Sequence, residues 1–341
     1  MSNLSINQSV AAFAALGQYL LNPDEQLTAI INTEQHHNAW FTPANVSNAI
    51  TAIGKLLNQN DLTSWLSNYS IDEHKAPKNI GLILAGNIPL VGFHDVLCVL
   101  ISGNNALIKA STQDARLIKF ILSKLVEIEP AFAGRFTFVD RLADFDAIIA
   151  TGSNNTSRYF EYYFGKVPNI IRKNRNSVAV LTGNETREQL FNLGRDIFDY
   201  FGLGCRNVSK LLVPAGYDPA TFFEAIEPYH TIIDHHKYHN NYDYNKSIYL
   251  VNGDKHLDNG FLLLKEDINW VSPLAVLYYQ YYDNMESVEE LINRETEQIQ
   301  CVVSAAPLKV KNQVVDFGMS QQPGLGDYAD GIDTLQFLIN L

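Results

Sequence analysis

The pattern of hydrophobic positions changes near residue 79. Before it, apolar residues recur at helical spacing, which predicts helices over 10–21, 24–37 and 42–57. After it, short apolar runs such as Ile80–Ala85 alternate with longer amphipathic runs, as in a sheet buried on both faces. The predicted strands are 80–85, 106–109, 135–139, 147–151 and 177–181, and the predicted helices between them are 89–101, 113–126 and 154–164. This alternation predicts an α/β fold with a doubly wound parallel sheet.

The rest of the chain mixes helices and strands less regularly. The predicted helices are 186–201, 220–226 and 287–293, and the predicted strands are 210–214, 247–251 and 274–279. We therefore expect a first domain with N-terminal helices and a parallel sheet over 1–182, a second α/β domain over 183–318, and a C-terminal return segment over 319–341.

A cysteine lies on a glycine-flanked turn between the helix 186–201 and the strand 210–214. Glycines allow a sharp turn and keep bulky side chains away from the sulfur of Cys205. The neighbouring charge of Arg206 favours the thiolate, which is the reactive form of cysteine. The alternative is an inert buried thiol, because free cysteines are mostly buried. Cys98 and Cys301 have apolar neighbours and are predicted to lie in the core.

Polar residues follow several of the predicted parallel strands, at the edge where doubly wound sheets bind ligands. They are Gly86, Asn87, Lys109, Ser111, Thr112, Gly152 and Ser153. The amide of Asn87 can face an oxygen, the Ser and Thr hydroxyls suit a ribose or a phosphate, and the amides after Gly152 can meet a phosphate. Ordinary turn chemistry is the alternative for each residue. Neither a G-x-G-x-x-G segment nor a P-loop occurs.

Composition excludes some classes of function. The net charge is −12 and no basic block occurs, so nucleic-acid binding is not expected. Three cysteines without metal-type pairing indicate a reducing compartment. Without a signal peptide or a membrane-length apolar run, we expect a cytoplasmic protein with no membrane span. His235 and His239 are four residues apart, but a site needs further ligands, so no metal is expected.

Four of these segments, taken in order, resemble the aldehyde dehydrogenase superfamily, and within it the fatty acyl-CoA reductase family of bacterial luminescence systems. They are Leu84–Leu90, Gly103–Ser111, Thr151–Ser153 and Gly204–Asn207. The resemblance implies an aldehyde-dehydrogenase-like fold with a cofactor domain and a catalytic domain. It also implies that Cys205 is the nucleophile and that Asn87 stabilises the oxyanion. Gly86, Lys109, Ser111, Thr112, Gly152 and Ser153 are the implied cofactor-binding residues, with Glu266 as a further candidate at the nicotinamide ribose.

Two departures from the superfamily pattern carry information. Members that hydrolyse their thioester have a glutamate where this chain reads Arg172–Ser177, so no base is available there to activate water. The basic residues of that stretch either meet phosphates of a coenzyme or form a solvated turn. NAD-preferring relatives have a glutamate three residues after the lysine, where this chain has Thr112. The absence of that charge favours NADPH, with NADH left open.

The activity implied by this resemblance is NADPH-dependent reduction of a fatty acyl-CoA, or of another acyl thioester, to the aldehyde. An acyl-enzyme forms on Cys205 and coenzyme A is the leaving group. Two alternatives stay open, which are an aldehyde dehydrogenase that produces acid and a non-reducing subunit that carries acyl groups. The expected partners are the small-molecule thioester, further copies in a homo-oligomer, and an acyl-transferring protein.

Overall fold

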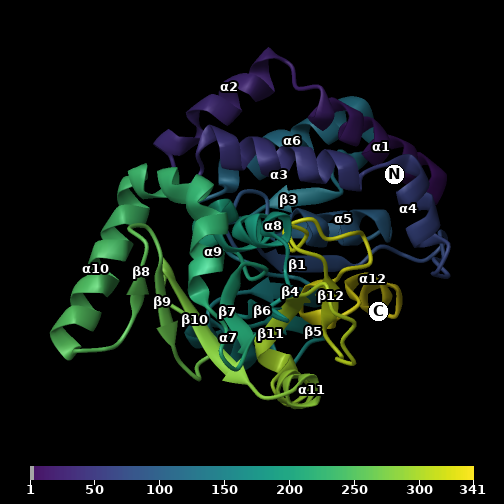
Figure 1. Ribbon diagram of the computed structural model, residues 1–341. Coiled ribbons are helices and arrows are strands. Elements are labelled where there is room, and N and C mark those ends of the chain that lie inside the picture. The colour runs from purple at the N-terminus through teal and green to yellow at the C-terminus, as the bar shows by residue number, and fades with distance from the viewer. Residues whose placement is uncertain (1–3) are drawn as a thin grey trace. The chain divides into compact units, whose positions relative to one another are not determined.

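Figure 1 shows the computed structural model of the protein, which describes residues 4–341. The chain forms two compact units. The first contains the chain up to Asn174, with Gly324–Tyr328 and Ile332–Leu341, and the second contains Arg175–Pro323 with Ala329–Gly331. The domain limits at 182 and 318 stay predictions, and the first three residues of the predicted 1–182 domain lie outside the described residues.

The first unit is built on a five-stranded sheet in the order β3-β2-β1-β4-β5, with every neighbouring pair parallel. The strands are β1 (Asn79–Ile83), β2 (Asn105–Lys109), β3 (Phe136–Phe138), β4 (Ala147–Thr151) and β5 (Asn169–Arg172). The chain moves outward in one direction from β1 to β3 and then returns to the other side of β1 with β4. The edge beyond the carboxyl ends of β1 and β4 is therefore the switch point at which such sheets bind ligands.

Helices pack around this sheet, and the N-terminal helix α1 contacts α3, α4, α5 and α6. Their starts carry side-chain caps, for example Ser5 before α1 and Thr42 before α3. The helices are α1 (Ile6–Leu21), α2 (Glu25–Thr33), α3 (Pro43–Leu56), α4 (Gln59–Leu66), α5 (Phe93–Ile101), α6 (Ala115–Ile128), α7 (Asn154–Phe164) and α12 (Thr334–Ile339), with short 3-10 helices η1 (Glu34–His36) and η2 (Pro130–Phe132).

The second unit is built on a seven-stranded sheet in the order β12-β11-β6-β7-β10-β9-β8. All pairs are parallel except β8 with β9. The strands are β6 (Asn176–Val180), β7 (Val208–Pro214), β8 (Leu257–Asp258), β9 (Leu263–Glu266), β10 (Val276–Tyr282), β11 (Ile299–Val303) and β12 (Gln313–Val315). The helices are α8 (Arg187–Phe198), α9 (Pro219–Ile226), α10 (His236–Asn252) and α11 (Met285–Arg294), with 3-10 helices η3 (Asp199–Gly202), η4 (Glu227–Asp234), η5 (Thr296–Gln298) and η6 (Ala329–Gly331).

The predicted α/β class is confirmed, and two predicted elements need correction. The predicted strand 247–251 is wrong, because these residues belong to the helix α10. The predicted helix 89–101 begins only at Phe93, because Leu90 has a φ of 58° and forms a turn in which Phe93 N–H donates to its carbonyl at 2.9 Å. A left-handed residue cannot continue into a right-handed helix.

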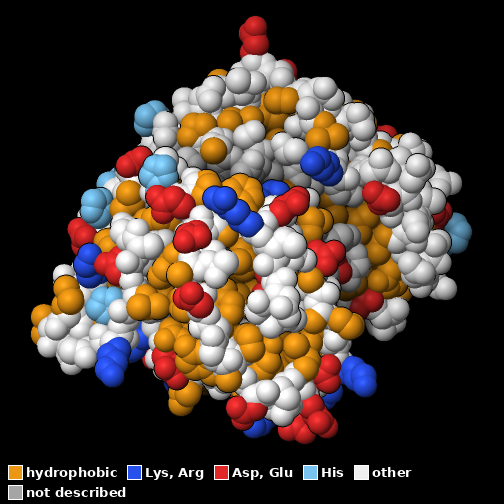
Figure 2. Space-filling view, in the orientation of Figure 1, with side chains coloured by type: hydrophobic (Ala, Val, Ile, Leu, Met, Phe, Trp, Pro, Cys, Tyr) orange, Lys and Arg blue, Asp and Glu red, His pale blue; other side chains and the backbone are white. Residues whose placement is uncertain are grey.

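Charged side chains of both signs are interspersed on the face shown in Figure 2, with lysine and arginine scattered among acidic residues. Within residues 4–341, no helix is both long and apolar enough to cross a lipid bilayer.

Candidate active site

The carboxyl ends of β1, β2 and β4 bring together seven of the residues predicted from the sequence. In the register of the sheet, Ile83 lies between Lys109 on β2 and Ala150 on β4. The loops that leave these strands therefore start at one level and on one edge. They carry Gly86 and Asn87 after β1, Ser111 and Thr112 after β2, and Gly152 and Ser153 after β4.

The first two loops touch at Gly86. A Cβ atom at this position would lie 2.4 Å from Ser111 Oγ and 2.6 Å from Ser111 Cβ, closer than real Cβ contacts allow. Glycine is therefore required for the loop after β1 to pack against the loop after β2. The sequence predicted both residues at this edge, but not that they contact each other.

Asn87 lies on the exposed part of this first loop, just before a strained turn. The turn contains Leu90, whose N–H donates to Asp114 Oδ2 at 2.8 Å. Asp114 is 5 % exposed, and burial raises the pKa of its carboxyl group well above the ordinary value. Asp114 thus holds the end of the Asn87 loop, a role that no sequence motif indicated.

Gly152 and Ser153 join β4 directly to the N-terminus of α7. Ser153 Oγ accepts a hydrogen bond from Thr156 N–H at 3.2 Å and caps the helix. A Cβ at Gly152 would lie 2.9 Å from the ring of Phe160, so the tight passage from strand to helix needs glycine. The positive end of the dipole of α7 therefore points to the same edge as Lys109, which is exposed at the end of β2.

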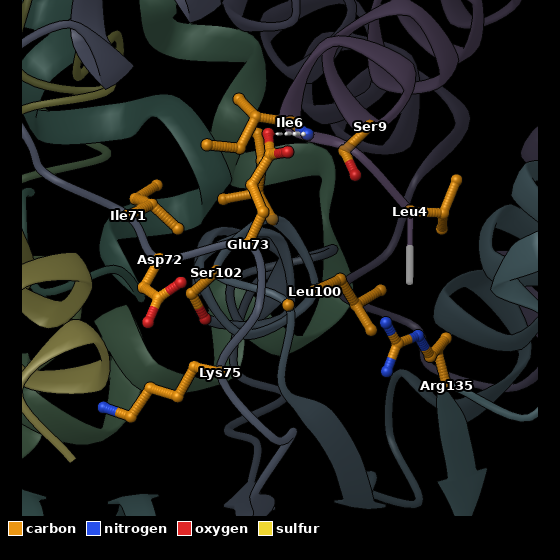
Figure 3. Close-up of a pocket in the computed structure, with 12 residues that line it drawn as sticks. Leu4, Ile6, Ser9, Ile71, Asp72, Glu73, Lys75, Leu100, Ser102 and Arg135 are labelled. Atoms are coloured by element: carbon orange, nitrogen blue, oxygen red, sulfur yellow. Dashed lines mark hydrogen bonds between the residues drawn. The ribbon is translucent and has the colours of Figure 1, made fainter. Parts of the chain in front are cut away.

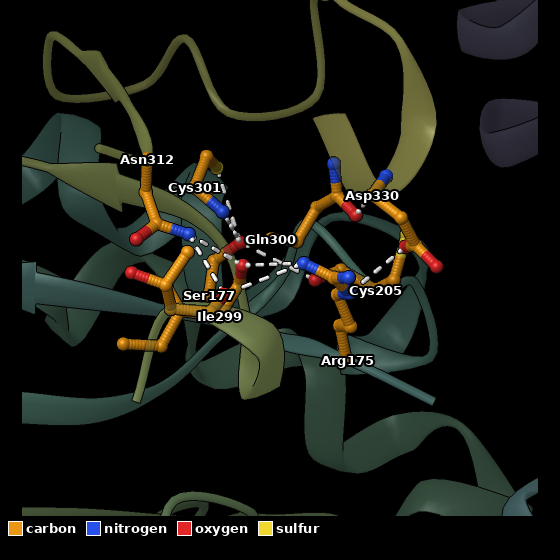
Figure 4. Close-up of polar contacts among 9 residues, drawn as sticks. Arg175, Ser177, Cys205, Ile299, Gln300, Cys301, Asn312 and Asp330 are labelled. Atoms are coloured by element: carbon orange, nitrogen blue, oxygen red, sulfur yellow. Dashed lines mark hydrogen bonds and ion pairs between the residues drawn. The ribbon is translucent and has the colours of Figure 1, made fainter. Parts of the chain in front are cut away.

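In the second unit, Cys205 lies on the turn that connects η3 with β7. Cys205 is partly exposed, whereas Cys98 and Cys301 are buried. Figure 4 shows Ser177 of β6 beside both Cys205 and Cys301. Ser177 Oγ donates to the Cys205 carbonyl at 3.2 Å and lies 3.0 Å from Cys301 Sγ. Of the three cysteines, only Cys205, the predicted nucleophile, is a partly exposed residue.

Arg206 follows the cysteine, but its guanidinium is held by other groups. Nε donates to the Ser320 carbonyl at 2.5 Å and Nη2 donates to Gln313 Oε1 at 2.6 Å. The side chain is buried, with 8 % exposure. These bonds tie the cysteine turn to the segment around β12, which is a positional role that the sequence did not predict.

The basic stretch Arg172–Ser177 has two exposed residues, Lys173 and Asn174, between the buried Arg172 and the half-buried Arg175. In the first unit, Arg172 Nη1 lies 2.5 Å from Asp95 Oδ2, with both side chains buried, and the exposed Lys173 lies 3.0 Å from Glu161. In the second unit, Arg175 Nε lies 3.2 Å from Asp330 Oδ1. Each cation thus has a carboxylate partner within its own unit.

Glu266 is the last residue of β9 and is exposed. The register places Glu266 level with Tyr279 and, through it, with Leu211 in the interior of β7. Cys205 lies before β7 begins. Since residues rise by about 3.3 Å along a strand, the register sets Glu266 and Cys205 at different levels of this sheet.

The histidine cluster at the start of α10 packs against the segment before the cysteine. The ring of His235 lies 4.3 Å, centroid to centroid, from the ring of Phe201 and stacks on His236 at 5.2 Å. His239 Nε2 lies 3.4 Å from Asp243 Oδ2 on the same helix. Among residues 4–341, no group of three metal-ligating side chains is gathered in a geometry that could hold an ion.

Figure 3 shows a separate pocket in the first unit. It is lined by residues that precede strands of the sheet, including Lys75 before β1, Gly103 before β2 and Arg135 before β3. This is the amino edge, opposite the edge that carries Asn87. Parallel sheets bind ligands at the carboxyl edge, so this pocket is not the candidate site.

A comparison with protein families matches residues 9–181 to the Acyl-CoA reductase (LuxC) family. The chain belongs to this family. The match confirms the resemblance found in the sequence. It includes the three loops at the carboxyl edge of the first unit and ends before Cys205. Acyl-CoA reductase family membership identifies an oxidoreductase that acts on acyl or aldehyde groups.

Solved structures of aldehyde dehydrogenases share the fold. Aldehyde dehydrogenase 21 from Physcomitrella patens, in complex with succinate, has a TM-score of 0.69 and 13% identity over 99% of this chain and 85% of that chain. A NAD-dependent benzaldehyde dehydrogenase from Corynebacterium glutamicum has a TM-score of 0.68 and 13% identity over 92% and 82%. An indole-3-acetaldehyde dehydrogenase in complex with NAD+ has a TM-score of 0.67 and 12% identity over 92% and 77%. No curated protein matches the sequence. The predicted aldehyde-dehydrogenase-like fold is confirmed.

Proposed function

We propose that the protein reduces a fatty acyl-CoA thioester to the aldehyde with NADPH, through an acyl-enzyme on Cys205. The observation that carries the proposal is a partly exposed cysteine on a buried, hydrogen-bonded turn in a chain of the acyl-CoA reductase family. The other two cysteines are buried and cannot meet a substrate. Solvent access is a condition for a nucleophilic thiol.

The carboxyl edge of the first unit fits a nicotinamide dinucleotide. The close contact at Gly86 lets the loop after β1 pack directly against the loop after β2. The N-terminus of α7, which follows Ser153, offers main-chain amides to a pyrophosphate. Lys109 supplies an exposed positive charge at the end of β2. The neutral, exposed Thr112 does not repel a 2′-phosphate, which supports NADPH. Some structural neighbours bind NAD+, so a nicotinamide cofactor is consistent with the fold.

In the proposed reaction, the Cys205 thiolate attacks the carbonyl carbon of the thioester. The carbonyl electrons move to oxygen, and the amide of Asn87 with a backbone N–H near Cys205 stabilises the oxyanion. The tetrahedral intermediate then expels the coenzyme A thiolate and leaves an acyl group on Cys205. A reduced nicotinamide, when bound, would supply the hydride that converts the thioester on Cys205 to a hemithioacetal alkoxide. Collapse of the hemithioacetal releases the aldehyde and restores the thiolate.

Acid production is disfavoured because the stretch Arg172–Ser177 contains no carboxylate that could activate water. The structure adds that two arginines of this stretch are held in ion pairs with Asp95 and Asp330. Transfer of the acyl group to and from a thiol needs no such base. The chemistry therefore favours thioester exchange over hydrolysis.

The test follows NADPH oxidation by the full chain with acyl-CoAs of graded length, with identification of the product and mass spectrometry of Cys205. We expect aldehyde formation by the wild type and an acyl adduct on Cys205 when NADPH is omitted. Cys205→Ala should abolish both, while Cys98→Ala, at a buried cysteine, should retain aldehyde formation. Aldehyde formation by Cys205→Ala would rule out the mechanism. Acid as the NADP-linked product would indicate a dehydrogenase, and acylation without turnover would indicate an acyl carrier.

A further inference from the structure

The turn that carries Cys205 is closed on both sides by one residue, Asn207. The N–H of Asn207 donates to the Gly204 carbonyl at 3.1 Å, and Asn207 Oδ1 accepts from the Gly204 N–H at 2.8 Å. These two bonds join Gly204 to Asn207 and so close the turn that contains Cys205. The Asn207 side chain is 1 % exposed, so both bonds are protected from water.

The same side chain also completes the end of α8. Asn207 Nδ2 donates to three carbonyls, those of Asp196 at 3.0 Å, Ile197 at 3.3 Å and Asp199 at 2.9 Å. The last carbonyls of a helix have no donor within the helix and need a partner when buried. Asn207 therefore acts as a cap for α8 from the far side of the cysteine turn.

The chain between α8 and the cysteine is strained. Tyr200, Phe201 and Gly202 have φ angles of 55°, 58° and 77°. Left-handed conformations of residues other than glycine cost about 1–3 kcal/mol each and persist only where the surrounding structure holds them. Asn207 holds this segment at both ends, because it bonds Asp199 before the strained residues and Gly204 after them.

We propose that Asn207 is a positioning residue, which fixes the orientation of the Cys205 thiol by joining its turn to the end of α8. The inference rests on the proposed function, in which Cys205 is the nucleophile. All of these Asn207 bonds are to main-chain groups, so Asn207 influences the reactivity of Cys205 through the conformation of the turn. Ser177 adds a third support, since its N–H donates to the Asn207 carbonyl at 3.1 Å.

The test measures how fast iodoacetamide alkylates Cys205 in the full chain, with the labelled peptide identified by mass spectrometry and the melting temperature recorded. In Asn207→Ala we expect both the alkylation rate and kcat to fall about 10- to 100-fold with KM nearly unchanged, because a misplaced reacting group loses rate. Asn104→Ala is the matched control. Asn104 is a buried asparagine of the first unit, 8 % exposed, that accepts from Lys78 N–H at 3.0 Å. This control should lower stability but leave alkylation of Cys205 unchanged.

A second variant keeps the proposal testable if Asn207→Ala does not fold. Asn207→Asp preserves the acceptor for Gly204 but sets a carboxylate against three carbonyl oxygens. Protonation of that carboxylate restores one donor, so the alkylation rate relative to the wild type should rise as the pH falls. A folded Asn207→Ala or Asn207→Asp protein with the wild-type alkylation rate at every pH would overturn the proposal. This readout needs no acyl-CoA, so it stands even if the wild type fails to reduce thioesters and the proposed function is wrong.

Discussion

Asp199 is a single carboxyl group whose titration should be visible in the stability of the protein. The pKa of its carboxyl group is raised from 3.8 to about 6, mainly by burial and to a smaller extent by the nearby Asp196, against the opposing charge of Arg195, whose Nε lies 3.8 Å away. The group is at the end of α8, where its main-chain carbonyl accepts from Asn207. Between about pH 4 and about pH 6, the folded protein therefore keeps a proton on Asp199 that the unfolded chain has already lost.

This difference predicts that the free energy of unfolding falls as the pH rises from about 4 to about 6, since unfolding then releases a proton. A shift of this size corresponds to at most about 3 kcal/mol. Asp199→Asn should remove that part of the pH dependence, measured by urea unfolding at a series of pH values. Asp283→Asn, at an exposed position, should keep the wild-type slope. An unchanged slope in Asp199→Asn would show that the carboxyl is ionised throughout.

Gly86 gives a second prediction for a single residue. Gly86→Ala places a Cβ 2.4 Å from Ser111 Oγ, so the two loops must separate. We expect a loss of stability of about 1–3 kcal/mol, as is usual for overpacking. Urea unfolding measures this loss, and fluorescence titration should show weaker binding of NADPH if the edge holds the cofactor.

The control and the rescue for Gly86 are both available in the chain. Gly326→Ala, at a glycine where a Cβ meets nothing within 4 Å, should have little effect. The double variant Gly86→Ala with Ser111→Gly should regain part of the loss, because the clash is with the Ser111 side chain. A purely additive double variant would contradict the contact.

At the scale of elements, α10 shows how one helix supports the connection between β9 and β10. Asn245 is 6 % exposed, and its Nδ2 donates to the Leu274 carbonyl at 2.9 Å. Asn245→Ala leaves that carbonyl without this donor, which should cost about 1–3 kcal/mol in the free energy of unfolding. Asn240→Ala, at an exposed position of the same helix, is the control and should change little. Equal unfolding midpoints for the two variants would show that the Leu274 bond contributes nothing.

The sequence was most informative where local chemistry and tertiary structure agree. The strand β4 and the helix α7 have the predicted bounds, because an apolar run ends at Gly152 and Ser153 caps the helix after it. The strand predicted at 247–251 failed because its apolar residues are the end of a helix. The buried residues of α10 are Tyr238, Tyr242, Asn245 and Tyr249, which recur at helical spacing. Because tyrosine and asparagine side chains carry polar atoms, these positions do not stand out as an apolar helical face in the sequence.

The candidate site divides in the same way. Residues at strand ends, such as Asn87 and Gly152, were predictable because parallel strands bring their carboxyl ends to one edge. The supports of Cys205 were not predictable, because they depend on which buried groups meet after folding. Asn207 was part of the recognised segment, but only the three carbonyls at the end of α8 give it a role.

At the scale of the whole molecule, the first unit is completed by the end of the chain. Tyr328 Oη lies 2.7 Å from Tyr69 Oη and accepts from Trp65 Nε1 at 2.9 Å. In α12, Leu335 and Leu338 are 0% and 1% exposed. The five-stranded sheet and its helices therefore depend on residues that lie about 150 positions after the last strand of that sheet, within Gly324–Tyr328 and Ile332–Leu341.

This dependence predicts where a change near the C-terminus acts. Leu335→Ala should lower the free energy of unfolding by about 2–5 kcal/mol, the usual cost of a cavity in a core. Gln336→Ala, at the adjacent exposed position, should stay within about 0.5 kcal/mol of the wild type. Because α12 belongs to the first unit, hydrogen exchange should show the loss of protection in β1, β2 and β4, with β6 and β7 retaining theirs. Equal loss in both sheets would mean that the two units unfold as one, and the C-terminal segment would then stabilise the whole chain.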